Sequence, residues 1–432
     1  MSLCTSNVTS GFIDLATFDE LEKYMYGGSD ATAYFVRDTR KSTWFTQVPV
    51  CLSRASGEIK FGSDFSVTIS RAGDYLLYTW LRVTLPEVKF KTGQKKGCWT
   101  RNIMHNLVEE ACITFNDLVA ARFDSYHLDF WAAFTTPAGK RNGYNNMIGN
   151  TNALNGEVSE TLNKTTLNLP LPFFFSRDSG VALPTAALPY NDMRITFKLR
   201  KQSELLLKVD PADNTALVDA VPNTDYDETP ELNGQVWANY AIVSNDERKR
   251  MACAPRDILI EQVQSAPKTT LSDSEKSYDV RFSHAIKALF FSARNTKVNN
   301  SWSNYTDTQP VLNGDFIEWQ NGSDPLETTS IIYENTTRLS QMGSDYYSLV
   351  NPYYHAPSIP LDTGYHLYSY SLDLCCLDPM GSTNYGKLTN VSVVTKPTAE
   401  ASTAESSHKL IVTAVNNNII RISGGALGFP VL

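Results

Sequence analysis

The residues of this 432-residue chain that come closest to a catalytic arrangement are two carboxylates beside an aromatic segment. Asp124 and Asp129 precede Trp131, and two carboxylates near an aromatic surface are the groups that glycoside hydrolysis uses. Sequence alone does not give their separation in space. The same pattern is also typical of a structural aromatic region with solvated acids, and we expect that second role. The chain is therefore predicted not to be an enzyme, and no catalytic residue is assigned.

Cofactor and metal motifs are absent from the sequence. It contains no GxGxxG, GxxxxGK[ST], HExxH or GxSxG string. The six histidines occur singly, without the spacing of a zinc site. The acidic stretch 209–234 lacks the regular oxygen spacing of a calcium loop, so we expect a surface loop there. We predict no cofactor and no metal.

Charge and cysteine content restrict the partners and the compartment. The net charge is -8 and only 19% of residues are charged, so direct contact with nucleic acid is not expected. The N-terminus lacks the basic and apolar regions of a signal peptide, which favours a cytosolic compartment. The seven scattered cysteines are expected to be free thiols: Cys4, Cys51, Cys98, Cys112, Cys253, Cys375 and Cys376.

Seven N-x-[ST] sequons occur, close to the number expected by chance. Four of them cluster in a polar stretch that we expect to be exposed. These are the candidate glycosylation sites Asn299, Asn304, Asn321 and Asn335.

Residues 1–30 are predicted to form an N-terminal arm with a short amphipathic helix. Thr17–Glu20 has the pattern of a capping box, and Gly27–Gly28 ends the helix. Its apolar residues recur at helical spacing: Phe18, Leu21, Tyr24 and Met25. Two interpretations stay open. The helix packs on its own domain, or it docks on a partner or a membrane surface.

The rest of the chain has the pattern of an all-β protein in two successive units. The units span 31–245 and 258–432, and a charged connector at 246–257, which we expect to include a short helix, joins them. The clearest strand is 75–85, with Tyr75, Leu77 and Thr79 expected on the same face as the apolar residues that follow. A hairpin with a turn at 416–418 is expected near the end, and a long polar loop at 295–345. Many short strands with long loops favour two sandwiches or jelly rolls.

Several segments, in a shared order along nearly the whole chain, carry a family resemblance. The most specific is Leu171–Phe175 with Ala182–Pro184 and Tyr190, followed by Trp237–Tyr240 with Asp246–Arg250. Other matching segments are Asn7–Asp19, Ser70–Leu77, Asn102–Asn106, Leu128–Trp131, Pro379–Tyr385 and Ala414–Asn417. The chain resembles the major capsid protein of large icosahedral double-stranded DNA viruses, and most closely that of iridoviruses. It departs from the family pattern at Asp378–Ser382, where the family often has Gln-Pro-Ser-Gly-Ser, and this departure affects only a local turn.

The resemblance implies a double jelly roll, which is two tandem eight-stranded β-sandwiches. It also implies homotrimers that are nearly hexagonal and that tile an icosahedral shell against neighbouring capsomers. The arm would face inward, toward minor capsid proteins and an internal membrane. The outer loops would be free to meet a host receptor. The resemblance places the protein in the virion capsid, with assembly in the host cytoplasm.

The alternative is a carbohydrate-binding or glycan-cleaving β-sandwich protein. Aromatic side chains in the predicted loops could stack on sugars. They are Trp302, Tyr305, Trp319, Tyr346, Tyr347, Tyr353 and Tyr354.

Overall fold

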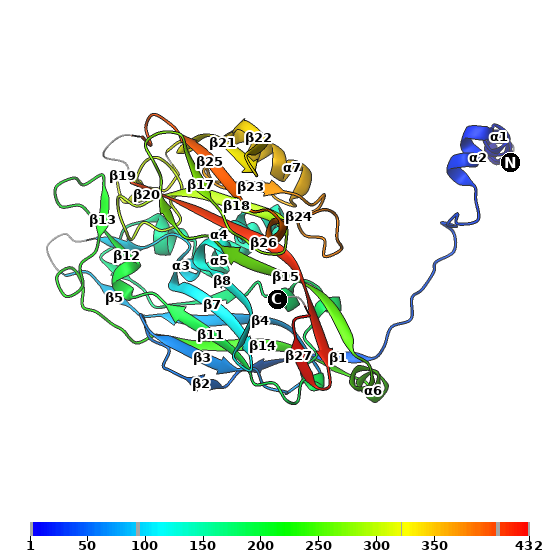
Figure 1. Ribbon diagram of the computed structural model, residues 1–432, viewed down its shortest axis with the longest axis horizontal. Helices are drawn as coiled ribbons and strands as arrows, with labels where there is room; N and C mark the ends of the chain where they lie inside the picture. The colour runs from blue at the N-terminus through cyan, green and yellow to red at the C-terminus, as the bar shows by residue number, and fades with distance from the viewer. Residues whose placement is uncertain (1–2, 92–95, 321, 403–406, 431–432) are drawn as a thin grey trace. The chain divides into compact units, whose positions relative to one another are not determined.

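The computed structural model describes residues 3–91, 96–320, 322–402 and 407–430, with side chains described from Asn7 onward. It divides the chain into two units, Met1–Trp44 and Phe45–Leu432, and each is described here by itself (Figure 1). Of the described helices, none is long and apolar enough to cross a membrane.

The N-terminal unit contains two helices, α1 (Leu3–Ala16) and α2 (Glu20–Tyr26). The predicted capping box was misplaced by two residues. Asp19 caps α2, because its carboxylate accepts from the Glu20 amide at 2.7 Å while the Glu22 carboxylate accepts from the Asp19 amide at 3.2 Å. Thr17 is not the cap because its hydroxyl donates to the Asp14 carbonyl at the end of α1. The sequence analysis did not predict α1.

The first sandwich is built from two antiparallel sheets with the orders β1-β14-β4-β10 and β2-β3-β11-β7-β8. Leu81 and Val83 from one sheet meet Ile195 and Phe197 from the other in a single buried core. The strands of the first sheet are β1 (Phe45–Cys51), β14 (Asn233–Val243), β4 (Tyr75–Leu85) and β10 (Thr165–Pro170). Those of the second are β2 (Arg54–Ser56), β3 (Asp64–Thr68), β11 (Met193–Leu199), β7 (Val108–Phe115) and β8 (Leu118–Asp124).

The second sandwich repeats this arrangement with the orders β15-β26-β18-β23 and β17-β25-β21-β22. The first of these sheets contains β15 (Arg256–Ser265), β26 (His408–Ser423), β18 (Ala285–Asn295) and β23 (His366–Ser369). The second contains β17 (Lys276–Asp279), β25 (Val391–Pro397), β21 (Leu326–Tyr333) and β22 (Thr336–Gly343). Because corresponding strands occupy corresponding places, the chain is a double jelly roll, as the sequence predicted.

Strand β4 has the predicted bounds but not a single uniform face. Its apolar residues point inward from Thr79 to Leu85, as expected. Before Thr79 the phase changes, because Leu77 has no opposite residue in β14 and forms a β-bulge. Leu76, rather than Leu77, is therefore buried.

Three other expectations fail where tertiary pairing outweighs local turn signals. Asn416–Asn418 is not a turn, because Gln262 and Ile260 of β15 pair with it and β26 runs through as one 16-residue strand. The predicted loop 295–345 contains β21 and β22, together with the short pair β19 (Val311–Asn313) and β20 (Phe316–Glu318). The acidic stretch 209–234 contains β13 (Leu217–Asp219).

The connections carry most of the helical structure. The charged connector is helical, as predicted, in α6 (Asn245–Cys253). Between β8 and β10 lie two helices that the sequence analysis did not identify, α4 (Ser125–Thr135) and α5 (Ala138–Ile148). A short helix, α3 (Ile103–Leu107), precedes β7. In the second sandwich, η6 (Tyr346–Val350) leads into α7 (Asn351–His355) between β22 and β23.

Candidate functional site

The two carboxylates named as the nearest to a catalytic pair have separate structural roles. Asp124 caps α4, with its carboxylate accepting from the His127 amide at 3.0 Å. Lys268 lies 3.9 Å from the other Asp124 oxygen. Asp129 is buried and bonds to a different set of groups. Glycoside hydrolysis needs one carboxylate free to react and one to give up a proton, and this pair offers neither.

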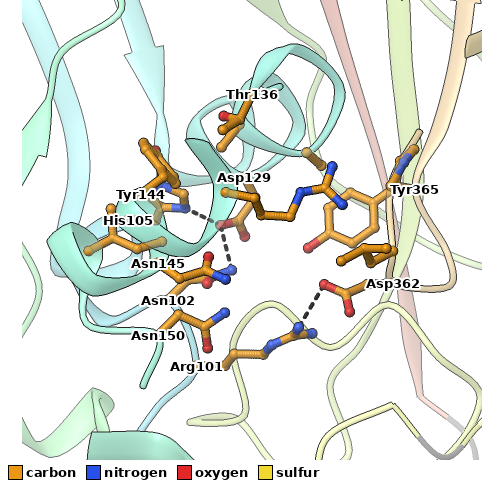
Figure 2. Close-up of a pocket in the computed structure, with 16 residues that line it drawn as sticks. Arg101, Asn102, His105, Asp129, Thr136, Tyr144, Asn145, Asn150, Asp362 and Tyr365 are labelled. Atoms are coloured by element: carbon orange, nitrogen blue, oxygen red, sulfur yellow. Dashed lines mark hydrogen bonds and ion pairs between the residues drawn. The ribbon is translucent and has the colours of Figure 1, made fainter. Parts of the chain in front are cut away.

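Asp129 is the centre of a buried hydrogen-bond network, shown in part in Figure 2. Its Oδ1 lies 2.6 Å from His105 Nδ1 and accepts from Asn102 Nδ2 at 3.3 Å. Its Oδ2 accepts from Ser303 Oγ at 2.6 Å and from the Tyr305 hydroxyl at 3.0 Å. A carboxylate has about four lone-pair positions, so these contacts fill them. Asp129 therefore has no free lone pair to serve as a nucleophile or a base.

The network extends from His105 to the hydroxyl of Tyr144, which lies 2.6 Å from His105 Nε2. Burial, with the nearby Asp129 charge, raises the pKa of Tyr144, so the hydroxyl stays protonated. Beside the network is a cavity of about 110 Å³, and Arg101 pairs with Asp362 across it at 2.6 Å (Figure 2). These contacts link the first sandwich to the second, which is a structural role. No sequence signal could show them, because the partners lie far apart in the chain.

Helix α4 makes the main aromatic contact between the two sandwiches. Phe130 stacks on Phe290 of β18 with ring centroids 6.1 Å apart and the planes 10° apart. Phe134 and Trp131 also pack on Phe290. Arg177 lies 3.5 Å from the centre of the Trp131 ring. As a result β18 is buried on both faces, one toward its own sandwich and one toward α4.

Most of the seven loop aromatics cannot stack on a sugar. Tyr305 and Tyr347 are buried, and Trp302 lies between the guanidinium groups of Arg200 and Arg294, 3.8 and 3.6 Å from its ring centre. Trp319 and Tyr346 are half-buried, and only Tyr353 and Tyr354 are exposed. This arrangement does not favour the carbohydrate-binding alternative.

The four predicted arm residues are all exposed within their own unit: Phe18, Leu21, Tyr24 and Met25. No residue of α2 is buried. The helix therefore has an apolar surface that its own unit leaves uncovered, which keeps the docking interpretation as the working hypothesis.

The candidate glycosylation sites lie in different environments. Asn299 and Asn335 are exposed, and Asn335 has a positive φ of 64° in the β21–β22 turn. Asn304 is buried, and its side-chain amide donates to the Thr308 carbonyl at 3.0 Å. Asn321 lies outside the described residues.

Side chains with metal-binding potential do not cluster. In the part of the chain that the structure describes, no group of three or more His, Cys, Asp or Glu side chains could hold an ion. The six cysteines described there are free: Cys51, Cys98, Cys112, Cys253, Cys375 and Cys376.

Comparisons with known proteins agree with this architecture. Residues 33–243 match the family described as major capsid protein N-terminus, and residues 247–428 match the family described as large eukaryotic DNA virus major capsid protein. The chain is 59% identical to the major capsid protein of Costelytra zealandica iridescent virus and 58% identical to that of Invertebrate iridescent virus 6, with complete coverage of both chains in each case. Its fold is similar to that of PBCV-1 VP54, at 20% identity and a TM-score of 0.77, covering 93% of this chain and 100% of that one.

Proposed function

The chain belongs to the major capsid proteins of large eukaryotic DNA viruses, and we propose that it forms homotrimers that tile an icosahedral virion shell. It is a structural protein of the virion capsid rather than an enzyme.

One observation carries the trimer proposal: two sandwiches of the same strand order occur in one chain. Three such chains around a threefold axis would place six similar sandwiches in a ring. A ring of six is nearly hexagonal, and hexagonal blocks tile a flat facet against neighbouring capsomers with little gap. Closed cyclic symmetry of this kind is usual for homo-oligomers.

The β18–β21 connection is proposed to form part of the outer surface, where a host receptor would meet the shell. In a jelly roll the β18–β21 and β22–β23 connections leave the same end of the sandwich, and the β21–β22 turn lies at the other end. Asn299 belongs to the first group and Asn335 to the turn. If either site carries a sugar, we therefore propose Asn299.

The arm is proposed to face inward and to bind minor capsid proteins. Surface helices that bind anionic membranes are usually rich in Lys and Arg. The charged residues of α1, of α2 and of the α2 N-cap are instead mostly acidic: Asp14, Asp19, Glu20, Glu22 and Lys23. Their sign favours a protein partner over the internal membrane. Free thiols in the described residues are consistent with assembly in a reducing host cytoplasm.

Native mass spectrometry of the purified chain tests the trimer. We expect a species at three times 48.1 kDa, about 144 kDa, that survives dilution to micromolar concentration. A stable monomer under mild conditions would contradict the proposal.

A further inference from the structure

The two sandwiches repeat each other residue by residue in one pair of corresponding strands. Strands β4 and β18 each have 11 residues and occupy the same place in their sheets. The third residue of each, Leu77 in β4 and Lys287 in β18, has no opposite residue in the neighbouring strand and forms a bulge. The sixth residues, Trp80 and Phe290, are therefore equivalent.

These equivalent residues have different surroundings. Phe290 is fully buried, because α4 of the first sandwich covers the outer face of its sheet. Trp80 lies on the outer face of the first sheet, and the described rings near it belong to its own sheet. It stacks on Trp237 with centroids 6.2 Å apart and lies 6.0 Å from Tyr78, which is 47% exposed. We call Tyr78, Trp80 and Trp237 the aromatic face.

The second sandwich has a segment equivalent to α4, namely η6–α7, and it is exposed where α4 is buried. Both α4 and the η6–α7 segment directly follow the last strand in the order of the second sheet of their sandwich, the edge strands β8 and β22. Each places one residue in its own core, Leu128 from α4 and Tyr347 from η6. In α4, the residues that then reach the other sandwich are Phe130, Trp131 and Phe134.

The same spacing after Tyr347 gives Leu349, Val350 and Tyr353, which we call the apolar ridge. Their exposed fractions are 52%, 43% and 69%. Three neighbouring apolar side chains exposed at the spacing that α4 uses for contact are typical of an interaction surface.

We propose that the apolar ridge of one chain packs on the aromatic face of a second copy, as α4 packs on Phe290 within the chain. The inference rests on the proposed homotrimer and assigns its contact residues. The chain contains both halves of this contact: the ridge side chains and Tyr78 are exposed, and Trp80 and Trp237 are half-buried. The intrachain contact between α4 and β18 serves as the template for it.

Repetition of this contact would close a ring of three chains. The template relates the first sandwich to the second. The proposed contact relates the second sandwich to the first sandwich of the next chain by a similar rotation. When the two steps alternate around a ring of six sandwiches, three chains close without a free face. A ridge that bound a different protein would leave the aromatic face uncovered in the trimer.

Photo-crosslinking identifies the contact directly. The probe is p-benzoylphenylalanine in place of Tyr353, which is exposed and aromatic, so the monomer should tolerate it. In the full-length protein we expect crosslinks between chains to residues 75–85 and 233–243. Trimers whose crosslinks map elsewhere would overturn the inference while leaving the proposed function intact. A wild-type chain that stays monomeric would overturn both the inference and the proposed trimer.

Charge substitution measures how much the apolar ridge contributes to the stability of the trimer. In the double variant Leu349→Asp and Tyr353→Asp, we expect the trimer association constant to fall by a hundredfold or more, at roughly tenfold for each lost anchor residue. The matched control is Leu361→Asp, at another highly exposed apolar position, which should leave the trimer intact. A thermal unfolding midpoint of the dissociated variant equal to that of dissociated wild-type chains would show that the monomer still folds. A double variant that remains trimeric would overturn the inference.

Discussion

The outer faces of β4 and β18 are two versions of one surface, and they differ in how far the chain itself covers them. The face of β18 is covered: Phe290 contacts Phe130 and Phe134 and is fully buried. The face of β4 carries Trp80, Trp237 and Tyr78, whose rings have an apolar body with a polar N–H or O–H. Such side chains tolerate water and also pack well once covered, which is why they are enriched at protein interfaces. The chain therefore covers the face of β18 by itself, and on our proposal a second copy covers the face of β4.

The bulges in the two strands differ in a related way. Lys287 is buried and pairs with Glu261 at 2.6 Å, and Arg177 lies 3.5 Å from the other Glu261 oxygen. Leu77 is half-buried and uncharged. The bulge of β18 thus anchors a buried ion cluster between the sandwiches, whereas that of β4 only changes the phase of its strand.

The largest expected difference follows from truncating the two equivalent aromatics. Phe290→Ala should lower the free energy of unfolding by about 3–5 kcal/mol, because it opens a cavity under α4. Trp80→Ala should cost the monomer less, since Trp80 is only half-buried, but it should weaken the trimer. Thermal unfolding of dissociated chains together with native mass spectrometry separates the two effects. Equal losses of monomer stability would show that the faces do not differ.

The bulge residues offer the next largest contrast. Lys287→Met should lower the free energy of unfolding by about 3 kcal/mol, because Glu261 then keeps a buried charge with only Arg177 as a partner. Leu77→Met changes shape but not charge and should cost less than about 1.5 kcal/mol. Urea unfolding of both variants measures the difference. If the Lys287 variant proved as stable as the Leu77 variant, the ion cluster would have no net stabilising role.

The sequence predicts the repeated parts of this molecule well because they depend on local patterns. The bounds of β4 follow from alternation and from the flanking Gly, Pro and Asp residues. The charged connector gives α6 for similar reasons. Two β-rich units of similar size then indicate a double sandwich.

The contacts between the sandwiches could not be predicted from the sequence. Helix α4 is buried on nearly every side because it faces two sandwiches, and polar Ser125, His127 and Asp129 are buried with its apolar residues, so it lacks the single apolar stripe by which surface helices are found. Asp129 is saturated by Ser303 and Tyr305, which lie far away in the chain. At Asn416 a strong turn signal is overridden, because its side chain is buried and accepts from Gln264 at 3.0 Å.

The free energy of unfolding is expected to depend on pH through His127, which lies against the covered face of β18. His127 lies between Trp131 and Phe290, and neither of its ring nitrogens has a hydrogen-bond partner among the described residues. Burial, and then the charge of Arg177, lower the pKa of His127 to about 3. The unfolded chain, with a pKa near 6.5, therefore binds more protons, and stability is lost as pH falls from about 6.5 toward 3.

At pH 5 this loss is about 2 kcal/mol, since each pKa unit corresponds to about 1.4 kcal/mol. His127→Leu removes the titrating group without breaking a hydrogen bond, so its unfolding free energy should fall less steeply between pH 7 and pH 5. Urea unfolding at several pH values gives both slopes. Parallel slopes would show that His127 does not charge on unfolding in this range.

The smallest perturbation leaves the sequence unchanged and uses the reactivity of a native thiol to measure the solvent exposure of the aromatic face. Cys51 is exposed and lies directly opposite Trp237 in the sheet, so the two side chains point to the same side as the aromatic face. Cys253 is exposed at the end of α6 and serves as an internal reference. A maleimide should label both thiols in dissociated chains, but in the trimer it should label Cys51 several times more slowly than Cys253. Mass spectrometry of digested protein at early times gives the two rates. If Cys51 reacted equally fast in both states, the face around Trp237 would be open to solvent in the assembled capsomer, and the difference between the two sandwiches would have to serve some purpose other than closing the ring.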